Sequence, residues 1–299
     1  MTDSGSGLTS RLTDAPVAAF IIGGVSLYVG ASLAVKLFPE VGAGSAAWLR
    51  LSGASVALAL ITRPWRPGVR GRALSRPVLL AALSFGVVSA VMNTSFYLAL
   101  DTLPLGNAVA LEFAGPVGIA LWASRSRRNV AAVALAGAGV VMLARVEWNA
   151  NRQGLLFVGV AAASWAAYVV LGKRLADLGH GITGLALSTT AGTLVLAPVF
   201  APGAAPVLGR PALLATALAV GVFANVVPYG IDQLVLPSLD HHQFALLLAI
   251  LPATAVAVAA VLLRQFPTWP EAAGIAAVSA GVALRDPPTE QELTALDVP

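Results

Sequence analysis

One carboxylate, Glu112, stands in the otherwise apolar and small-residue run GNAVALEFAGPVG, residues 106–118. Pro116 follows four residues later. A proline has no N–H to bond the carbonyl four residues before it, and that carbonyl belongs to Glu112 itself. The side chain and the freed carbonyl together predict an acceptor site for an ammonium group or a proton. The alternative is that Glu112 only braces neighbouring helices through a hydrogen bond.

Arg50 is the basic counterpart, in the run AAWLRLSG, residues 46–53. A guanidinium can bind a carboxylate through two parallel N–H bonds, so Arg50 is a candidate for holding the carboxylate of a zwitterionic substrate while Glu112 holds its amino group. Arg50 and Glu112 also suit each other as a resting ion pair that opens when a zwitterion enters. The competing interpretation is that the Arg50 side chain snorkels to the membrane interface.

Two Asn–Tyr pairs have the same spacing. Asn93 and Tyr97 are four residues apart, as are Asn225 and Tyr229, so each pair shares one face of a helix. Pro228 precedes Tyr229. Matching polar faces in two segments predict the lining of a cavity, whereas ordinary interhelical hydrogen bonds are the alternative.

Aromatic and proline residues complete the candidate site. Tyr28, Trp165 and Tyr168 are candidates for aromatic walls of the pocket, although aromatic side chains also serve as plain packing or interface residues. Pro116 and Pro228, together with Pro252, are candidate hinges, as proline interrupts the hydrogen bonds of a helix.

The elements that position these groups must lie in lipid. Of the 299 residues, 58% are hydrophobic and 11% are charged, and the mean hydropathy is +0.83. Soluble domains carry about a quarter charged residues. There is no cysteine and there are three histidines, too badly spaced for a convincing metal site. Walker, Ser-His-Asp and HExxH patterns are absent from the sequence, so we expect neither an enzyme nor a cofactor.

Apolar runs of roughly membrane-spanning length recur ten times along the chain. A helix needs about 20 mostly apolar residues to cross the hydrocarbon layer, and several of these runs are shorter. We expect an all-α integral membrane fold with ten transmembrane helices. The runs are Val17–Leu37, Ser45–Ile61, Val78–Leu100, Pro104–Ala123, Val130–Leu143, Leu155–Gly172, Leu185–Phe200, Leu213–Leu234, Phe244–Leu263 and Glu271–Leu284.

Basic residues predict the orientation. Of the 18 Lys and Arg residues, twelve fall at one side of the predicted membrane, five at the other, and Arg50 within a span. Because cytoplasmic loops carry the excess of basic residues, both termini are expected in the cytoplasm of a plasma (bacterial inner) membrane protein. The short loops that carry the charges argue against nucleic acid and leave membrane lipid as their partner.

The two halves of the chain resemble each other. SLYVGASLAVK (26–36) matches SWAAYVVLGK (164–173), and EFAGPV (112–117) matches AILPAT (249–254). Five spans per half is an odd number, so the second copy enters the membrane from the opposite face, as in the inverted repeats of secondary transporters. We therefore expect a cytoplasmic tail (1–15), two five-helix repeats (16–147 and 154–285) and a disordered cytoplasmic tail (286–299).

The EFAGPV motif and the SW-x-x-Y-x-x-x-GKR pattern of the sixth run resemble the drug/metabolite transporter superfamily and, within it, the EamA family. The run MNTSFYLALDTLPLGNAVALEFAGPVGIAL (92–121) is similar to the threonine/homoserine exporter branch. The second copy departs from the family pattern, because Leu248 aligns with Glu112 and Leu251 precedes Pro252.

The resemblance implies a secondary transporter that exports small amphipathic metabolites, with amino acids such as threonine or homoserine as substrates. Alternating access around a central cavity is the expected mechanism, and proton antiport is the natural energy source, although no residue pattern shows it. Two other hypotheses stay open: a broad-range exporter of drugs, aromatic amino acids or metabolites, and an integral membrane enzyme that acts on lipid precursors.

Overall fold

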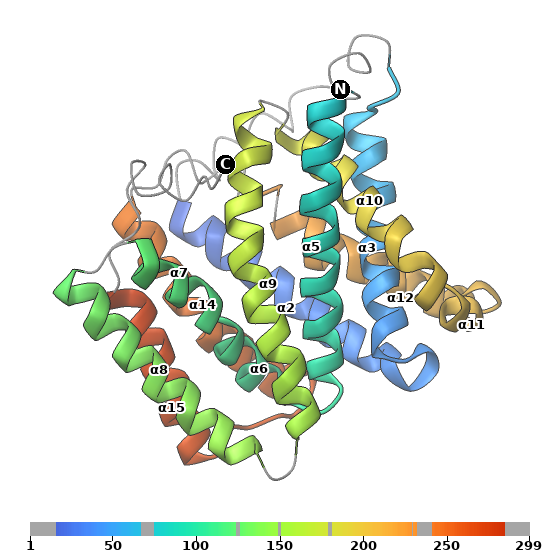
Figure 1. Ribbon diagram of the computed structural model, residues 1–299. Coiled ribbons are helices and arrows are strands. Elements are labelled where there is room, and N and C mark those ends of the chain that lie inside the picture. Colours follow the sequence, from blue (N-terminus) through green and yellow to red (C-terminus); the bar gives the residue numbers. More distant parts are fainter. Residues whose placement is uncertain are drawn as a thin grey trace.

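The computed structural model describes residues 16–66, 75–123, 126–148, 151–178, 181–228, 230–231 and 241–284, and within these ranges every regular element is helical (Figure 1). The predicted tails and Tyr229 lie outside the described residues. The helices of the first half are α2 (Pro16–Val41), α3 (Ala43–Thr62), α5 (Arg76–Leu100), α6 (Leu105–Glu112), α7 (Ala114–Ala123) and α8 (Arg127–Glu147). Those of the second half are α9 (Arg152–Asp177), α10 (Gly181–Phe200), η1 (Pro202–Ala204), α11 (Ala205–Leu208), α12 (Pro211–Gly221), η2 (Val222–Val226), α14 (His241–Leu262) and α15 (Trp269–Leu284).

Six of the described helices are long and apolar enough to cross a membrane: α2, α3, α5, α8, α9 and α10. Shorter apolar helices cover Pro211–Val226, Leu246–Leu262 and Trp269–Leu284. Each of the ten predicted runs falls at least partly on this helical structure. The count of ten membrane crossings, and their division into two inverted repeats, stay predictions.

The helices pack in pairs that join the two halves of the chain. Helix α8 lies along α15, α5 along α9, α3 along α10, and α2 along α14 (Figure 1). Each pair combines a helix from before residue 148 with one from after residue 151. The two halves therefore interleave, and a site between them receives side chains from both.

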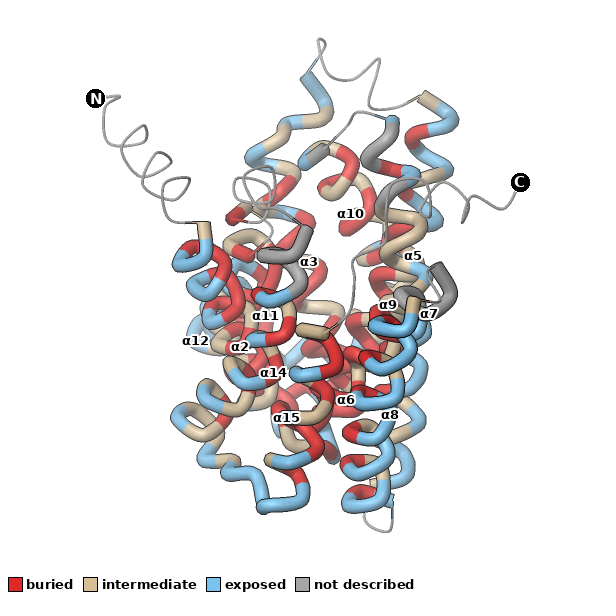
Figure 2. Tube along the Cα trace, turned by 90° about the vertical axis from the view of Figure 1, so that its left-hand side faces the viewer, coloured by how far each residue is buried: buried red, intermediate tan, exposed pale blue. Residues whose placement is uncertain are grey.

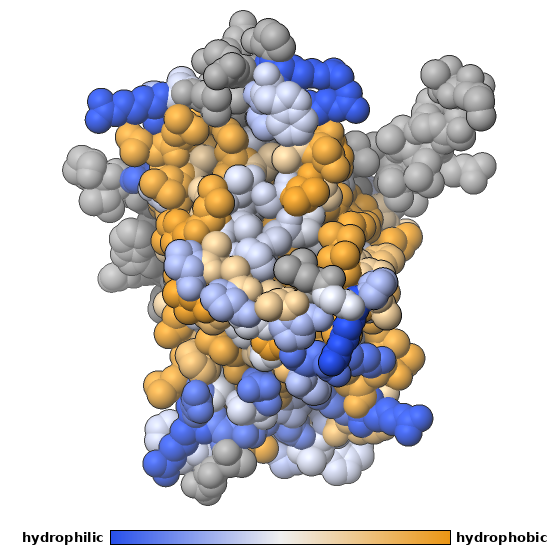
Figure 3. All heavy atoms as spheres, turned by 90° about the vertical axis from the view of Figure 1, so that its right-hand side faces the viewer, coloured by the Kyte–Doolittle hydropathy of each residue, from blue (hydrophilic) through white to orange (hydrophobic). Residues whose placement is uncertain are grey.

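The outer surface of the bundle is apolar. Leu156, Val199 and Val261 are among many large hydrophobic side chains that are mostly exposed, whereas the interior of the bundle is buried (Figure 2). One face of the molecule shows hydrophilic residues gathered toward its two ends and hydrophobic residues across much of the middle (Figure 3). An apolar band between two polar ends is the surface that a lipid bilayer covers.

The predicted fourth span, Pro104–Ala123, is divided in two. Helix α6 ends at Glu112, Phe113 forms a turn, and α7 begins at Ala114. The interruption is one residue long, because the Phe113 N–H still bonds the Val109 carbonyl and the Val117 N–H bonds the Phe113 carbonyl. The missing bond is the one that Pro116 cannot give to the Glu112 carbonyl. Pro252, at the matching place of the sequence repeat, lies inside α14, which continues without a break.

The predicted eighth span changes its hydrogen-bond pattern along its length. Helix α12 passes directly into η2, a single π-helical turn, and the Val227 N–H bonds the Val222 carbonyl five residues earlier. Pro228 follows. Isolated π turns inside helices occur frequently at functional sites, and this one carries Asn225.

Candidate functional site

Arg50 is buried at the junction of α3 and η2, with 5% of its surface exposed. Its Nη2 donates to the Ala224 carbonyl at 3.0 Å and to the Asn225 side-chain oxygen at 3.1 Å. The guanidinium is therefore held inside the bundle by the second half of the chain. The alternative in which Arg50 snorkels to the interface does not describe this structure.

The Ala224 carbonyl is available to Arg50 because of Pro228. The N–H of residue 228 would bond the carbonyl of residue 224 in an α-helix and that of residue 223 in a π-helix, and proline has no N–H to give to either. These two carbonyls accept instead from Arg50 and from Ser26. A buried carbonyl without a partner is costly, so the guanidinium satisfies an acceptor that the proline leaves open. This is the same physical rule that predicts a free carbonyl at Glu112 from Pro116.

Close backbone contact brings α2 against this turn. Gly30 of α2 faces Ala224, where a Cβ added at Gly30 would lie 2.6 Å from the Ala224 backbone nitrogen. The Ser26 hydroxyl donates to the Phe223 carbonyl at 2.8 Å. Helices α2 and α3 thus enclose the π turn, and only glycine at position 30 permits this approach.

Tyr97 of α5 completes the surroundings of Arg50. The guanidinium carbon lies 5.3 Å from the centre of the Tyr97 ring, within the range of a cation–π contact, and Tyr97 is fully buried. Three donor atoms here lack a hydrogen bond of normal geometry among the described residues: Arg50 Nε, Asn225 Nδ2 and the Tyr97 hydroxyl. The Tyr97 hydroxyl is nevertheless close enough to Arg50 for the two groups to interact. A buried unsatisfied donor costs about 1–3 kcal/mol, so these atoms suit an acceptor supplied by a ligand.

Glu112 lies near this cation without touching it. The charges of Arg50 and Glu112 interact through space, and the Tyr28 hydroxyl of α2 lies in the field of the same carboxylate. Within the described part of the chain, Glu112 makes no hydrogen bond and no ion pair. The expected resting ion pair with Arg50 is therefore not formed, because Ala224 and Asn225 satisfy the guanidinium instead.

Aromatic rings adjoin the carboxylate. Phe113, the residue after Glu112, contacts Trp165 of α9 edge-to-face, with ring centres 4.9 Å apart. Tyr28 is buried in the same hydrophobic cluster as Tyr97 and Phe113. Two of the three predicted aromatic wall residues, Tyr28 and Trp165, therefore lie next to the candidate site.

Other predicted residues are placed elsewhere. The Asn93 amide donates to the Ser89 carbonyl of its own helix at 2.7 Å, the bonding expected of an ordinary buried asparagine. Tyr168 packs against Phe85, with ring centres 4.5 Å apart, in a separate hydrophobic cluster. Pro252 is buried inside α14.

Sequence reasoning missed two features. The Ala224 carbonyl could have been found by applying the rule used for Pro116 to Pro228. A second buried polar cluster, formed by Asn107, Glu147 and Glu271, was also missed, although T-x-x-E at residues 268–271 is the pattern of a helix capping box. No group of three His, Cys, Asp or Glu residues with metal-binding geometry occurs in the described ranges.

The site combines a buried cation, aromatic rings and a carboxylate that has no partner in the described part of the chain, and its residues come from both halves of the bundle. Together with the apolar exterior, these features define a membrane protein with an internal polar site. Residues 152–285 match the EamA-like transporter family. The threonine/homoserine exporter RhtA of Salmonella typhimurium (strain SL1344) is 33% identical over 243 residues, 80% of each chain. RhtA of Escherichia coli (strain K12) is 32% identical over the same share. The chain belongs to the EamA-like transporter family.

A solved crystal structure is similar over 97% of this chain and 99% of its own, with a TM-score of 0.56 and 19% sequence identity. At that identity the likeness concerns the fold alone. It extends over nearly the whole chain, including the half that precedes residue 152.

Proposed function

We propose that this chain is a secondary transporter that exports amino acids of the threonine/homoserine type across the bacterial inner membrane. The observation that carries the proposal is the set of polar atoms around Arg50 and Glu112 that have no hydrogen-bond partner among the described residues. The unpaired donors of Arg50, Asn225 and Tyr97 complement a carboxylate, and Glu112 complements an ammonium group. A zwitterion has both groups on one small molecule.

Substrate identity is supported by the relatives, whose names describe them as threonine/homoserine exporters. Identity of about a third over four fifths of each chain supports a shared substrate class. Transport rather than an enzymatic reaction is the role proposed for the site.

The mechanism we propose is alternating access by ten helices in two inverted repeats, with both termini in the cytoplasm. Residues from both halves meet at the site, which suits a substrate held between two moving units. Pro116 and Pro228 are the proposed hinges, because the helix breaks after Glu112 and changes its hydrogen-bond pattern before Pro228. Glu112 is also the proposed carrier of a proton in antiport.

A second candidate is a broad-range exporter of aromatic amino acids or drugs. The specific observation in its favour is the aromatic lining beside Glu112, formed by Tyr28, Phe113 and Trp165. Competition separates the two candidates: an excess of unlabelled phenylalanine or of a hydrophobic cationic drug inhibits threonine transport only if the site admits large apolar groups.

Uptake of radiolabelled threonine and homoserine into inverted membrane vesicles tests the proposal. Vesicles that contain the protein should accumulate both amino acids, and an imposed pH gradient, acidic inside, should increase the accumulation. Vesicles from cells without the protein are the control. Equal uptake in both kinds of vesicle, under every gradient, contradicts the proposal.

A further inference from the structure

A second polar cluster lies at the opposite end of α6 from Glu112. Asn107 of α6 is almost fully buried, and its Nδ2 donates to Glu147 Oε1 of α8 and to Glu271 Oε1 of α15. Both carboxylates are also more than nine-tenths buried. One amide thus bridges two acidic side chains from the two halves of the chain.

Each carboxylate has further donors that fix its position. Glu271 Oε2 accepts from the Thr268 backbone N–H and from the Thr268 hydroxyl, both at 2.6 Å, as in a capping box at the start of α15. Glu147 Oε2 accepts from the Asn151 side chain. The two acceptors are therefore anchored on α8 and α15, and Asn107 is the group through which α6 joins them.

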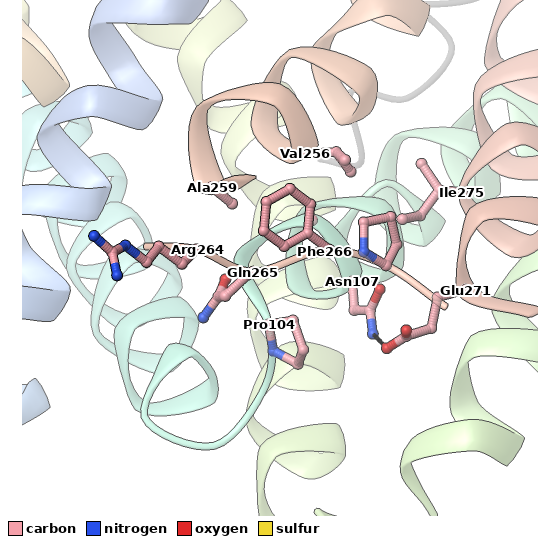
Figure 4. A pocket seen from close by; sticks show the side chains of 11 residues that line it. Pro104, Asn107, Val256, Ala259, Arg264, Gln265, Phe266, Glu271 and Ile275 are labelled. Atoms are coloured by element: carbon pink, nitrogen blue, oxygen red, sulfur yellow. Dashed lines mark hydrogen bonds between the residues drawn. The ribbon is translucent and has the colours of Figure 1, made fainter. Parts of the chain in front are cut away.

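A second hydrogen bond crosses the same seam, which is the contact of α6 with α14, α15 and the segment between them. The Leu105 backbone N–H, at the first position of α6, donates to the Gln265 side chain in the segment that follows α14, at 3.0 Å. A cavity of about 310 Å³ lies beside these bonds, lined by residues of α6, α14 and α15. Figure 4 shows Asn107 and Glu271 pointing toward each other, while Arg264 points away from them.

Helix α6 joins the second polar cluster to Glu112. It has eight residues, so it is about 12 Å long, and it begins after Pro104 and ends at the break before Phe113. Asn107 lies near its start and Glu112 is its last residue. A movement of α6 that changes the position of one of these side chains therefore changes the position of the other.

The other charged side chains of the neighbouring elements lie apart from Asn107 and its two carboxylate partners. Arg145 of α8, Arg152 of α9, Arg264 after α14 and Asp101 after α5 are exposed, and Glu112 is at the far end of α6. Among the described residues the only ion pair within 4.0 Å, between Glu40 and Arg210, lies on the surface. The amide of Asn107 is thus the link between α6 and the two carboxylates.

We propose that Asn107 holds the outer gate closed, by binding α6 to Glu147 and Glu271, and that α6 swings away from α14 and α15 when the transporter opens outward. The inference rests on the proposed function, from which it takes alternating access and the outer side. With the N-terminus in the cytoplasm, α2, α3 and α5 make three crossings, so the start of α6 lies at the outer face. Asn107 is a positioning residue: it acts on Glu112 through α6 and does not touch the substrate.

Cysteine labelling tests this inference directly, because the chain contains no cysteine. V256C places a thiol in the seam, since Val256 lines the cavity and faces Gly106 of α6, where an added Cβ would lie 2.6 Å from the Val256 side chain. F266C is the reference for an open position, because Phe266 is 75% exposed. A membrane-impermeant maleimide is added to intact cells, and the rate at V256C is divided by that at F266C.

The N107D variant replaces the bridging donor by a third carboxylate, which repels the other two. The relative labelling rate of V256C should rise at least about tenfold, a change of roughly 1.4 kcal/mol in the closed-to-open equilibrium. N107A, which removes the donors without adding charge, should raise the rate less, and it takes the place of N107D in the comparison if N107D does not fold. E40Q removes an exposed carboxylate elsewhere on the protein and should leave the ratio unchanged.

Rescue by a second substitution separates a gate from a general loss of structure. In N107D/E271Q an amide on α15 again donates to a carboxylate on α6, so the bond across the seam is restored. The carboxylate introduced at position 107 still faces Glu147, so labelling should return part of the way toward the original rate. The transport rate at saturating threonine should fall in N107D and recover in the double variant, with little change in KM.

An unchanged V256C ratio in folded N107D and N107A overturns the inference, as does labelling of F266C only in inverted vesicles. The labelling needs no substrate, so it separates the two proposals. If threonine transport is normal and the labelling ratio is the same with and without N107D, the proposed gate is wrong and the proposed function stands. If N107D raises the labelling ratio but the original chain transports no amino acid, the proposed amino-acid export is wrong and the proposed gate stands.

Discussion

Helix α5 and the α12–η2 segment each carry the asparagine of an Asn–Tyr pair with the same spacing, yet the two asparagines bond differently. In α5, which is continuous from Arg76 to Leu100, Asn93 donates to the Ser89 carbonyl of its own helix. In η2 the Asn225 oxygen accepts from Arg50 of another helix, next to the Ala224 carbonyl. The Asn93 amide is thus bonded within α5, whereas η2 presents two acceptors to the Arg50 guanidinium of another helix.

Proline combined with a π turn accounts for the difference. Pro228 leaves the Ala224 carbonyl without its helical partner, and the π turn carries Asn225. Proline alone is insufficient to interrupt a helix, since α14 continues through Pro252. In these two segments, the asparagine bonds a side chain of another helix only where the backbone around it is interrupted.

Removal of the cation is the change with the largest expected effect. Arg50→Met leaves the Ala224 carbonyl and Asn225 without their donor, and each hydrogen bond to a charged group is worth about 1.5–3 kcal/mol. Threonine transport should fall about 100-fold or more. Arg50→Lys, which keeps the charge without the planar fork, should retain part of the activity. Normal transport by folded Arg50→Met contradicts a binding role for Arg50.

Paired substitutions of the two asparagines test the comparison itself. Asn225→Leu removes a hydrogen bond to a charged group, worth about 1.5–3 kcal/mol, and should lower kcat/KM for threonine about 10- to 100-fold. Asn93→Leu removes a bond within one helix and should change kcat/KM by less than about 3-fold. Equal losses in the two variants indicate that α5 and η2 contribute alike.

Pro228→Ala sharpens the role of the freed carbonyl. Alanine supplies an N–H that competes with Arg50 for the Ala224 carbonyl, and a hydrogen bond of this kind is worth about 1 kcal/mol. The KM for threonine should rise about fivefold while the protein stays folded. Pro252→Ala is the matched control. If both variants transport threonine like the original chain, the freed Ala224 carbonyl has no role in binding.

Glu40→Gln is expected to have the smallest effect. The Glu40–Arg210 ion pair joins the two halves at 2.6 Å, but its side chains are 42% and 60% exposed, and surface pairs contribute about 0–1 kcal/mol. Transport and the midpoint of thermal unfolding should both stay close to those of the original chain. A large loss of stability shows that surface contacts between the halves matter as much as the buried site.

The sequence predicted the helical class and most apolar runs. It also singled out Arg50, Glu112, Tyr97 and Asn225, because charges and polar groups in apolar runs are few, and the structure places these residues near one another. Their role in binding stays a prediction. The sequence did not predict the partner of Arg50. Which acceptor a buried guanidinium reaches depends on where a backbone turn lies in space, and the expected ion pair with Glu112 was wrong for that reason.

Asn107, Glu147 and Glu271 were missed because they lie near the ends of predicted spans, where polar residues are usually solvated. They come from three helices that are distant in the chain, and only the packing of α6 between α8 and α15 buries them together. The T-x-x-E pattern at residue 268 indicated a capping box but not its contact with Asn107.

Transport by Glu112→Gln is the most direct test of the central claim that an unpaired carboxylate beside Arg50 binds the substrate amino group. Gln keeps the shape of the side chain and removes its charge. Initial rates of threonine uptake into inverted vesicles should fall at least about 10-fold, the loss expected for a hydrogen bond to a charged group, and the remaining activity should no longer vary with pH. An uptake rate and a pH profile equal to those of the original chain would show that Glu112 carries neither substrate nor proton.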